Sequence, residues 1–233
     1  MLMKFLYIIS SICLFFYNSN LYAENNATLM QKGEWKDPKT GLIWMRCTIG
    51  QKFIKNSCEG NGILFTSEDA KDYINKYVNP MYKLTKSKAW RIPEVEEFAA
   101  IRACTNGWLQ DIKQTSELTE SGRIYKDKKV TRWTHINGKK LPSLCSELSK
   151  RPAINEKIFP NLPKPSNKEH ESWQQFYWTS TSANKTMLWN INLYNGLLGY
   201  ANRQDKLKDK NWEKLFNLPP INITEYILLV RDE

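Results

Sequence analysis

A run of basic residues with interleaved aromatic residues is the most distinctive chemical feature of this sequence. Between Ser121 and Lys140 there are seven basic residues against one acidic residue, Asp127. Lysine and arginine at this density can contact successive sulfates or phosphates, and aromatic rings can stack on sugar faces. A charge run can also be no more than a solvated surface. We predict a polyanion-binding surface formed by Arg123, Tyr125, Lys126, Lys128, Lys129, Arg132, Trp133, Lys139 and Lys140.

The 233-residue chain is basic as a whole, with a formal net charge of +10. Such an excess favours an anionic partner, although it can also serve only to keep the protein soluble. The expected partners are an anionic polysaccharide or a surface protein. Intracellular nucleic acid is not expected, because the chain begins with an export signal.

Residues 1–23 have the three parts of a secretory signal peptide. Lys4 supplies a positive charge, Phe5 to Tyr17 form an apolar run, and Ala23 is a small residue at the expected cleavage site. The apolar run is shorter than the roughly 20 residues that a transmembrane helix needs. We therefore expect export to the periplasm, cell surface or medium, without a transmembrane anchor.

Four cysteines remain once Cys13 is removed with the signal peptide: Cys47, Cys58, Cys104 and Cys145. An even number in an oxidising compartment predicts disulfides. Three pairings are possible. We favour Cys47–Cys58 with Cys104–Cys145, because each pair brackets a turn-rich segment and the two loops do not interleave. A zinc site is the alternative, but no C-x-x-C spacing supports it.

Two helices are expected in the first half of the chain. Thr66 can cap a helix over residues 66–79, with Asp69 three positions on. Its apolar face consists of Ala70, Tyr73, Ile74, Tyr77 and Val78, and Pro80 is expected to end it. A second helix is expected to begin at Pro93, with acidic residues in its first turn and Val95, Phe98 and Ala99 turned inward.

Strands are expected mostly in the second half, apart from an early strand at residues 42–45 and a loop between Cys47 and Cys58. Residues 176–181 are aromatic and β-branched. A hairpin is predicted around Asn195-Gly196. The apolar run at residues 226–231 is typical of a central strand buried on both faces. Because most helices come before most strands and do not alternate with them, the sequence indicates an α+β fold.

The sequence contains little that indicates catalysis. His135 and His170 are the two histidines, and neither lies in a metal-binding spacing. A Gly-x-Ser-x-Gly elbow, a phosphate-binding loop and a dinucleotide fingerprint are all absent from the sequence. We expect a protein that is not an enzyme and needs no metal or cofactor; an unrecognised hydrolase is the alternative.

Several short blocks follow one another in a fixed order. The first runs from Asp37 to Cys47 and closes at Cys58; the second is Trp90-Arg91-Ile92-Pro93 with Glu97-Phe98. The closing block comprises Phe159-Pro160, residues 177–181, Gly196 and Leu229-Val230-Arg231. Together, over about residues 35–232, they resemble the family typified by the C-terminal domain of the Legionella collagen-like adhesin.

The resemblance implies a C-type-lectin-like fold with two helices and a mainly antiparallel sheet. It also implies a non-catalytic, adhesin-like binding domain for sulfated or other anionic glycans, and a homotrimer. This chain differs in having no collagen-like stalk and in its basic and proline-rich insertions at about residues 105–175. The expected organisation is a flexible lead-in at residues 24–34 and a single domain at residues 35–233. The alternative function is a structural or assembly subunit of a surface or secretion apparatus.

The residues shared with that family are expected to be structural. Tryptophans at positions 44, 90 and 178 are large apolar side chains suited to a core. Arg91 can pair with Glu96 or Glu97, and Arg231 can bind another carboxylate. The expected structural set is Trp44, Trp90, Arg91, Pro93, Glu97, Trp178 and Arg231.

Overall fold

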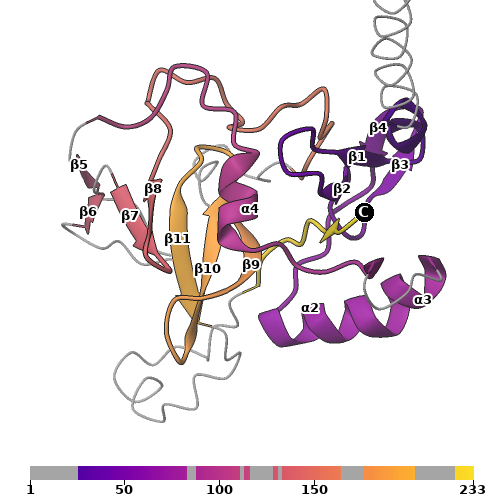
Figure 1. Cartoon of the computed structure of the whole chain (residues 1–233). Helices are drawn as coiled ribbons and strands as arrows, with labels where there is room; N and C mark the ends of the chain where they lie inside the picture. Colours follow the sequence, from indigo (N-terminus) through magenta and orange to yellow (C-terminus); the bar gives the residue numbers. More distant parts are fainter. Residues whose placement is uncertain are drawn as a thin grey trace, which may run out of the picture.

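The computed structural model describes residues 26–82, 88–110, 113–115, 128–130, 133–163, 176–202 and 224–233. The predicted signal peptide at residues 1–23 lies outside the described residues. The described part is an α+β structure, as predicted, in which helices and short antiparallel strands surround one buried C-terminal segment (Figure 1).

The strands form several small sheets rather than the one sheet that was expected. One three-stranded sheet has the order β1-β2-β12 and another the order β11-β10-β9, and three further pairs form two-stranded hairpins. Among the described residues, the named strands pair antiparallel throughout, and the isolated bridge between Tyr177 and Tyr226 is parallel. The first sheet contains β1 (Glu34–Lys36), β2 (Ile43–Met45) and β12 (Val230–Arg231), and the second contains β9 (Phe176–Ser182), β10 (Met187–Asn192) and β11 (Leu198–Asn202). The hairpins are β3 (Lys52–Ile54) with β4 (Ser57–Glu59), β5 (Lys113–Thr115) with β6 (Lys128–Val130), and β7 (Trp133–Ile136) with β8 (Lys139–Pro142).

The C-terminal segment is central to the fold, as its apolar run predicted. Ile227, Leu228, Leu229 and Val230 are each 0% exposed. Its backbone carbonyls accept hydrogen bonds from both sides. On one side, the Met45 amide donates to the carbonyl of residue 229 and the Ile49 amide to that of residue 227. On the other side, the Arg91 amide donates to the carbonyl of residue 230 and the Trp178 amide to that of residue 226. Within this segment only Val230–Arg231 is a regular strand, because the hydrogen-bond partners of the segment as a whole come from several different elements.

Alternate side chains of this segment point into two separate core clusters. Ile227 and Leu229 belong to the cluster that contains Trp90 and Trp178. Leu228 and Val230 belong to the cluster that contains Trp44, Phe98 and Tyr177. Since side chains alternate across an extended chain, one segment fills both clusters at once.

The first predicted helix forms with the expected cap. The Asp69 amide donates to Thr66 Oγ1 at 3.1 Å, at the start of α2 (Ser67–Tyr73). The prediction that Pro80 ends the helix was wrong: a π-helical turn, η1 (Ile74–Val78), is followed by α3 (Asn79–Tyr82). Pro80 lies in the first turn of α3, where its missing N–H costs no hydrogen bond within that segment.

The second predicted helix begins later than Pro93. Helix α4 spans Val95–Ala100, and its N-cap is Glu94, whose amide donates to Glu97 Oε2 at 2.7 Å. Pro93 stays outside the helix because its carbonyl accepts a hydrogen bond from the Ser180 amide of β9. Val95, Phe98 and Ala99 are buried, as predicted.

Two other segments have more regular structure than the sequence suggested. Residues 26–31, assigned above to a flexible lead-in, are helical, and Leu29 packs against the core. The stretch between Cys47 and Cys58 was expected to be a loop but contains the β3–β4 hairpin. Lys55 and Asn56 turn this hairpin with φ values of 48° and 65°, without the Asn-Gly or Asp-Gly pair that usually marks such a turn.

Candidate functional site

The β7–β8 hairpin brings together part of the predicted polyanion surface. Ile136 is 2% exposed and belongs to the second core cluster, and Leu141 packs against the same cluster. The opposite face of the hairpin therefore points outward, and it carries Trp133, His135 and Lys140. His135 and Lys140 are direct cross-strand partners, and Lys140 Nζ lies 4.6 Å from the Trp133 ring centroid.

The side chain of Lys139 points toward α4, whereas that of Lys140 lies against the Trp133 ring. Its register partner is the buried Ile136, and its Nζ lies 3.8 Å from Glu96 Oε1 on α4. The Lys139 side chain is 67% exposed, so this ion pair adds little stability. It does direct the Lys139 ammonium toward α4 rather than toward the Trp133 ring.

The remaining predicted polyanion residues are only partly covered by the structure. Lys128 and Lys129 lie in β6, opposite Thr115 and Gln114 of β5. Arg123, Tyr125, Lys126 and Arg132 lie outside the described residues. His135 was not included in the predicted polyanion-binding set. The sequence signal that could have identified it is its spacing of two from Trp133, because residues i and i+2 lie on the same face of a strand.

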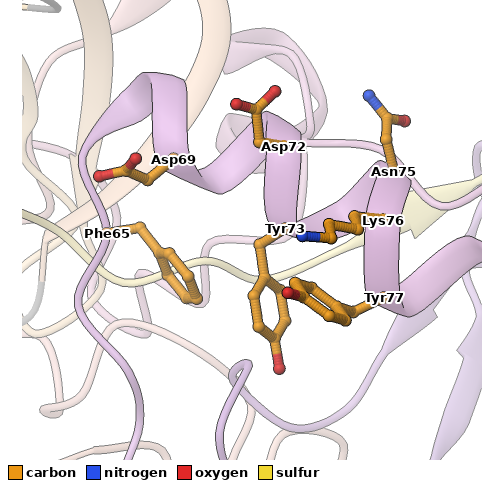
Figure 2. Close-up of a pocket in the computed structure, with 7 residues that line it drawn as sticks. All are labelled: Phe65, Asp69, Asp72, Tyr73, Asn75, Lys76 and Tyr77. Carbon is orange, nitrogen blue, oxygen red and sulfur yellow. The ribbon is translucent and has the colours of Figure 1, made fainter.

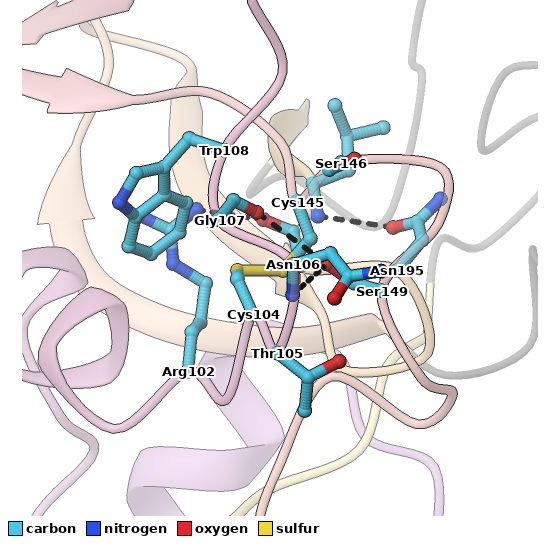
Figure 3. Close-up of a disulfide and its surroundings, with 12 residues drawn as sticks. Arg102, Cys104, Thr105, Asn106, Gly107, Trp108, Cys145, Ser146, Ser149 and Asn195 are labelled. Atoms are coloured by element: carbon cyan, nitrogen blue, oxygen red, sulfur yellow. Dashed lines mark hydrogen bonds between the residues drawn. A yellow bond between two sulfur atoms is a disulfide. The ribbon is translucent and has the colours of Figure 1, made fainter.

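The base of this region is held by the second disulfide (Figure 3). Cys104 and Cys145 are bonded, as predicted, with their Cα atoms 5.1 Å apart. Trp108 and Cys145 form an antiparallel bridge, and the Leu109 amide donates to the carbonyl of Leu144 just after β8. Gly196 packs so closely that an added Cβ would lie 2.5 Å from Cys145 Sγ. The glycine is therefore required by the packing of the disulfide as well as by its φ of +78°.

Arg102 is buried beside this disulfide without a carboxylate partner among the described residues. Its Nη1 donates to the Gly196 carbonyl at 2.7 Å, and its Nε donates to the Ala99 carbonyl at 3.2 Å. The guanidinium stacks 4.6 Å from the Trp108 ring centroid. Burial lowers the pKa of Arg102 to about 10, so it stays charged at neutral pH. It connects α4 to the β10–β11 hairpin and has a structural role.

The first disulfide also pairs as predicted, with the Cα atoms of Cys47 and Cys58 5.5 Å apart. Arg46, next to it, is 2% exposed and donates to three backbone carbonyls. Its Nη1 reaches Met30, its Nη2 reaches Lys157 and its Nε reaches Ile158, at 2.8, 3.0 and 2.6 Å. Burial lowers the pKa of Arg46. One side chain thus ties the N-terminal helical segment to residues 157–158.

Replacing Arg46 should destabilise the protein without changing its exposed surface. Arg46→Leu leaves three carbonyls without their donor, and each hydrogen bond to a charged group is worth roughly 1.5–3 kcal/mol. The relieved desolvation of the guanidinium offsets part of this loss. We expect the free energy of unfolding to fall by about 3 kcal/mol in urea titrations. Arg46→Lys, which keeps the charge and some donors, should recover part of it; equal stability of Arg46→Leu and wild type would contradict this assignment.

The residues expected to be structural are buried or ion-paired. Trp44, Trp90 and Trp178 are at most 1% exposed. Arg91 forms two hydrogen bonds with the Glu97 carboxylate, at 2.7 and 2.8 Å, and Arg231 donates to Glu34 Oε2 at 2.7 Å. The carboxylate of Glu97 raises the pKa of Arg91. Of the two predicted glutamates, Glu97 is therefore the one that pairs with Arg91, which also contacts Asp232 at 3.4 Å.

A surface groove lies along α2 and η1 (Figure 2), and Figure 1 shows α2 apart from the β7–β8 hairpin. It has a volume of about 560 Å³. The aromatic rings form a row, with centroids 5.0 Å apart for Phe65 and Tyr73 and 5.1 Å apart for Tyr73 and Tyr77. Tyr77, predicted to lie on the apolar face, is 50% exposed. The groove is lined by Phe65, Asp69, Asp72, Tyr73, Asn75, Lys76 and Tyr77.

No cluster of three or more His, Cys, Asp or Glu side chains in the described ranges is arranged to hold a metal ion. Within those ranges, no helix has both the length and the apolar character needed to cross a bilayer.

The fold and site define a small α+β domain with two disulfides, a covalent pattern typical of proteins that fold in an oxidising compartment. The chain belongs to the Lcl C-terminal domain family, whose family model matches residues 33–211, more than three quarters of its length. This assignment agrees with the ordered blocks of the sequence. Searches of curated proteins and of solved structures gave no match.

Proposed function

We propose that this chain is an exported, non-catalytic, adhesin-like domain that binds sulfated or other anionic glycans. The observation that carries the proposal is the outward face of β7–β8, where Lys140 lies against the Trp133 ring beside His135. A cation and an aromatic surface side by side suit a sugar that bears an anionic group. Membership of the Lcl C-terminal domain family and the net charge of +10 support the same conclusion.

The hairpin is also built as a rigid platform, which favours binding. Its inner face packs on the second core cluster through Ile136 and Leu141, and Thr134 Oγ1 lies 2.5 Å from Ser143 Oγ. The Ser143 carbonyl accepts from the Leu198 amide of β11. Residues on such a platform lose little conformational freedom on binding, so more of the contact energy appears as affinity.

The proposal predicts tight, salt-sensitive retention on immobilised heparin. The protein should elute above physiological salt, and later than from a plain cation exchanger. Trp133→Ala/Lys140→Ser should weaken heparin binding by about tenfold, because it removes both the stacking surface and its cation. A second variant, with Arg123, Lys126, Lys128, Lys129 and Arg132 replaced by serine, tests the preceding basic segment.

The matched control is Lys39→Ser/Tyr82→Ala. It also removes one exposed lysine and one exposed aromatic residue, from the β1–β2 turn and from α3, which Figure 1 shows apart from the β7–β8 hairpin. Heparin retention should be the same for this control and wild type. Equal retention of all variants, or retention no better than on the cation exchanger, would contradict glycan binding. It would favour the alternative of an assembly subunit that docks a partner protein.

A further inference from the structure

We propose that the groove along α2 and η1 is a second ligand site, which binds a neutral sugar residue through the rings of Tyr73 and Tyr77 and the carboxylates of Asp69 and Asp72. This inference does not rest on anionic-glycan binding at β7–β8. The groove has the opposite charge character from the hairpin, although the protein as a whole carries a net charge of +10.

The two sides of the groove have different chemistry. Figure 2 shows the three rings on one side of the helical ribbon, the side chains of Asp69, Asp72 and Asn75 projecting on the other, and Lys76 reaching toward the Tyr77 ring. Carboxylate and amide groups can hydrogen-bond pairs of sugar hydroxyls, while an aromatic ring packs against the apolar C–H face of a pyranose. A site of about 560 Å³ is within the usual size range of small-ligand sites.

The two tyrosines form one surface because they lie four residues apart in the helical segment, and a π-helical turn follows Tyr73. The Asn79 amide donates to the Ile74 carbonyl, five residues back, which widens the turn. Tyr73 and Tyr77, four residues apart, lie with their ring centroids 5.1 Å apart. A π-turn of this kind is rare and frequently occurs at functional sites. Here it presents an exposed aromatic surface, with Tyr77 half exposed.

One end of the groove, at Phe65, is fixed to the core. Phe65 is 8% exposed, its backbone pairs with Glu225, and its carbonyl accepts a hydrogen bond from Trp178 Nε1 at 2.8 Å. Asp69 is held by Thr66, whose Oγ1 donates to Asp69 Oδ2 at 2.8 Å. This arrangement leaves Asp69 Oδ1 to accept a hydroxyl, and Phe65 and Asp69 need little reorganisation on binding.

Charge in the groove selects for a neutral ligand. Two carboxylates disfavour the sulfated or uronic sugars proposed for the hairpin. Lys76 Nζ lies 5.1 Å from the Tyr77 ring centroid, so a sugar that packs on that face of the ring displaces the ammonium, and a cationic ligand would be repelled by it. A polyol has donors for the carboxylates and acceptors for Lys76 and Asn75.

The test uses protein that is expressed with its own residues 1–23 and purified after export. The probes are the methyl glycosides of glucose, galactose, mannose and N-acetylglucosamine, followed by saturation-transfer and amide-shift NMR. Binding of at least one probe should be saturable and should shift the amides of α2 and η1. Tyr77→Ala should weaken it by about tenfold and Asp72→Asn by several-fold.

Matched controls separate the groove from the rest of the surface. Tyr200→Ala removes a tyrosine of similar exposure, and Glu156→Gln removes an exposed carboxylate, both outside the groove. Neither control should change sugar binding, and Tyr77→Ala and Asp72→Asn should leave heparin retention unchanged. The proposal would be overturned if none of the four probes bound, or if groove and control variants had equal effects. It would also be overturned if a cationic probe (choline) or an anionic probe (a heparin disaccharide) bound at α2 in preference to the neutral sugars. If only heparin binding were lost, the proposal of a neutral-sugar site at α2 and η1 would still stand.

Discussion

A chain that ends at Glu225 should fail to fold. The deletion removes the four fully buried side chains of residues 227–230, which fill both core clusters. Burial of each such side chain contributes roughly 1.5–3 kcal/mol, so their loss removes about 6–12 kcal/mol. The total stability of a domain is only about 5–15 kcal/mol. The deletion also leaves the amides of Met45, Ile49 and Trp178 without their acceptors.

The control for this truncation is a chain that ends at Arg231. It loses the contacts of Asp232 with Arg91 and of Glu233 with Lys36. Both acidic side chains are mostly exposed, and exposed ion pairs contribute about 0–1 kcal/mol. Near-ultraviolet circular dichroism and urea unfolding should therefore show a folded, slightly less stable protein. A cooperative unfolding transition in the chain that ends at Glu225 would show that the segment is not central.

Removal of the Cys104–Cys145 disulfide should cause the second largest loss of stability. The bridge closes a loop with a sequence separation of 41. On the chain-entropy model a loop of that length contributes about 4 kcal/mol, mostly through the unfolded state. Cys104→Ser/Cys145→Ser should lower the free energy of unfolding by about that amount, measured by urea titration without reductant.

The other disulfide provides an internal comparison. Cys47 and Cys58 are separated by 11 residues, for which the same model gives about 3 kcal/mol. The loss for Cys47→Ser/Cys58→Ser should therefore be the smaller of the two. A larger loss for this pair would mean that local packing around Arg46, rather than loop length, decides the contribution.

The sequence by itself determined the features that depend on neighbouring residues or on hydrophobic pattern. The Thr66 cap, the inward face of α4 and strands β2 and β9 follow from local propensity and spacing. The disulfide pairing followed from the position of four cysteines around two separate segments. The burial of residues 227–230 followed from a continuous apolar run. The ordered blocks also identified the family.

Only the tertiary structure decided the features that depend on contacts between distant segments. The direction of Lys139 toward Glu96, rather than toward Trp133, depends on where α4 packs against the hairpin. The start of α4 depends on Ser180, which occupies the carbonyl of Pro93. The groove beside Tyr77 depends on Phe65, whose backbone Trp178 holds in place from a distant strand. The physical reason is the same in each case: a residue's own pattern specifies whether it is buried or helical, whereas the partner that orients it is distant in the chain.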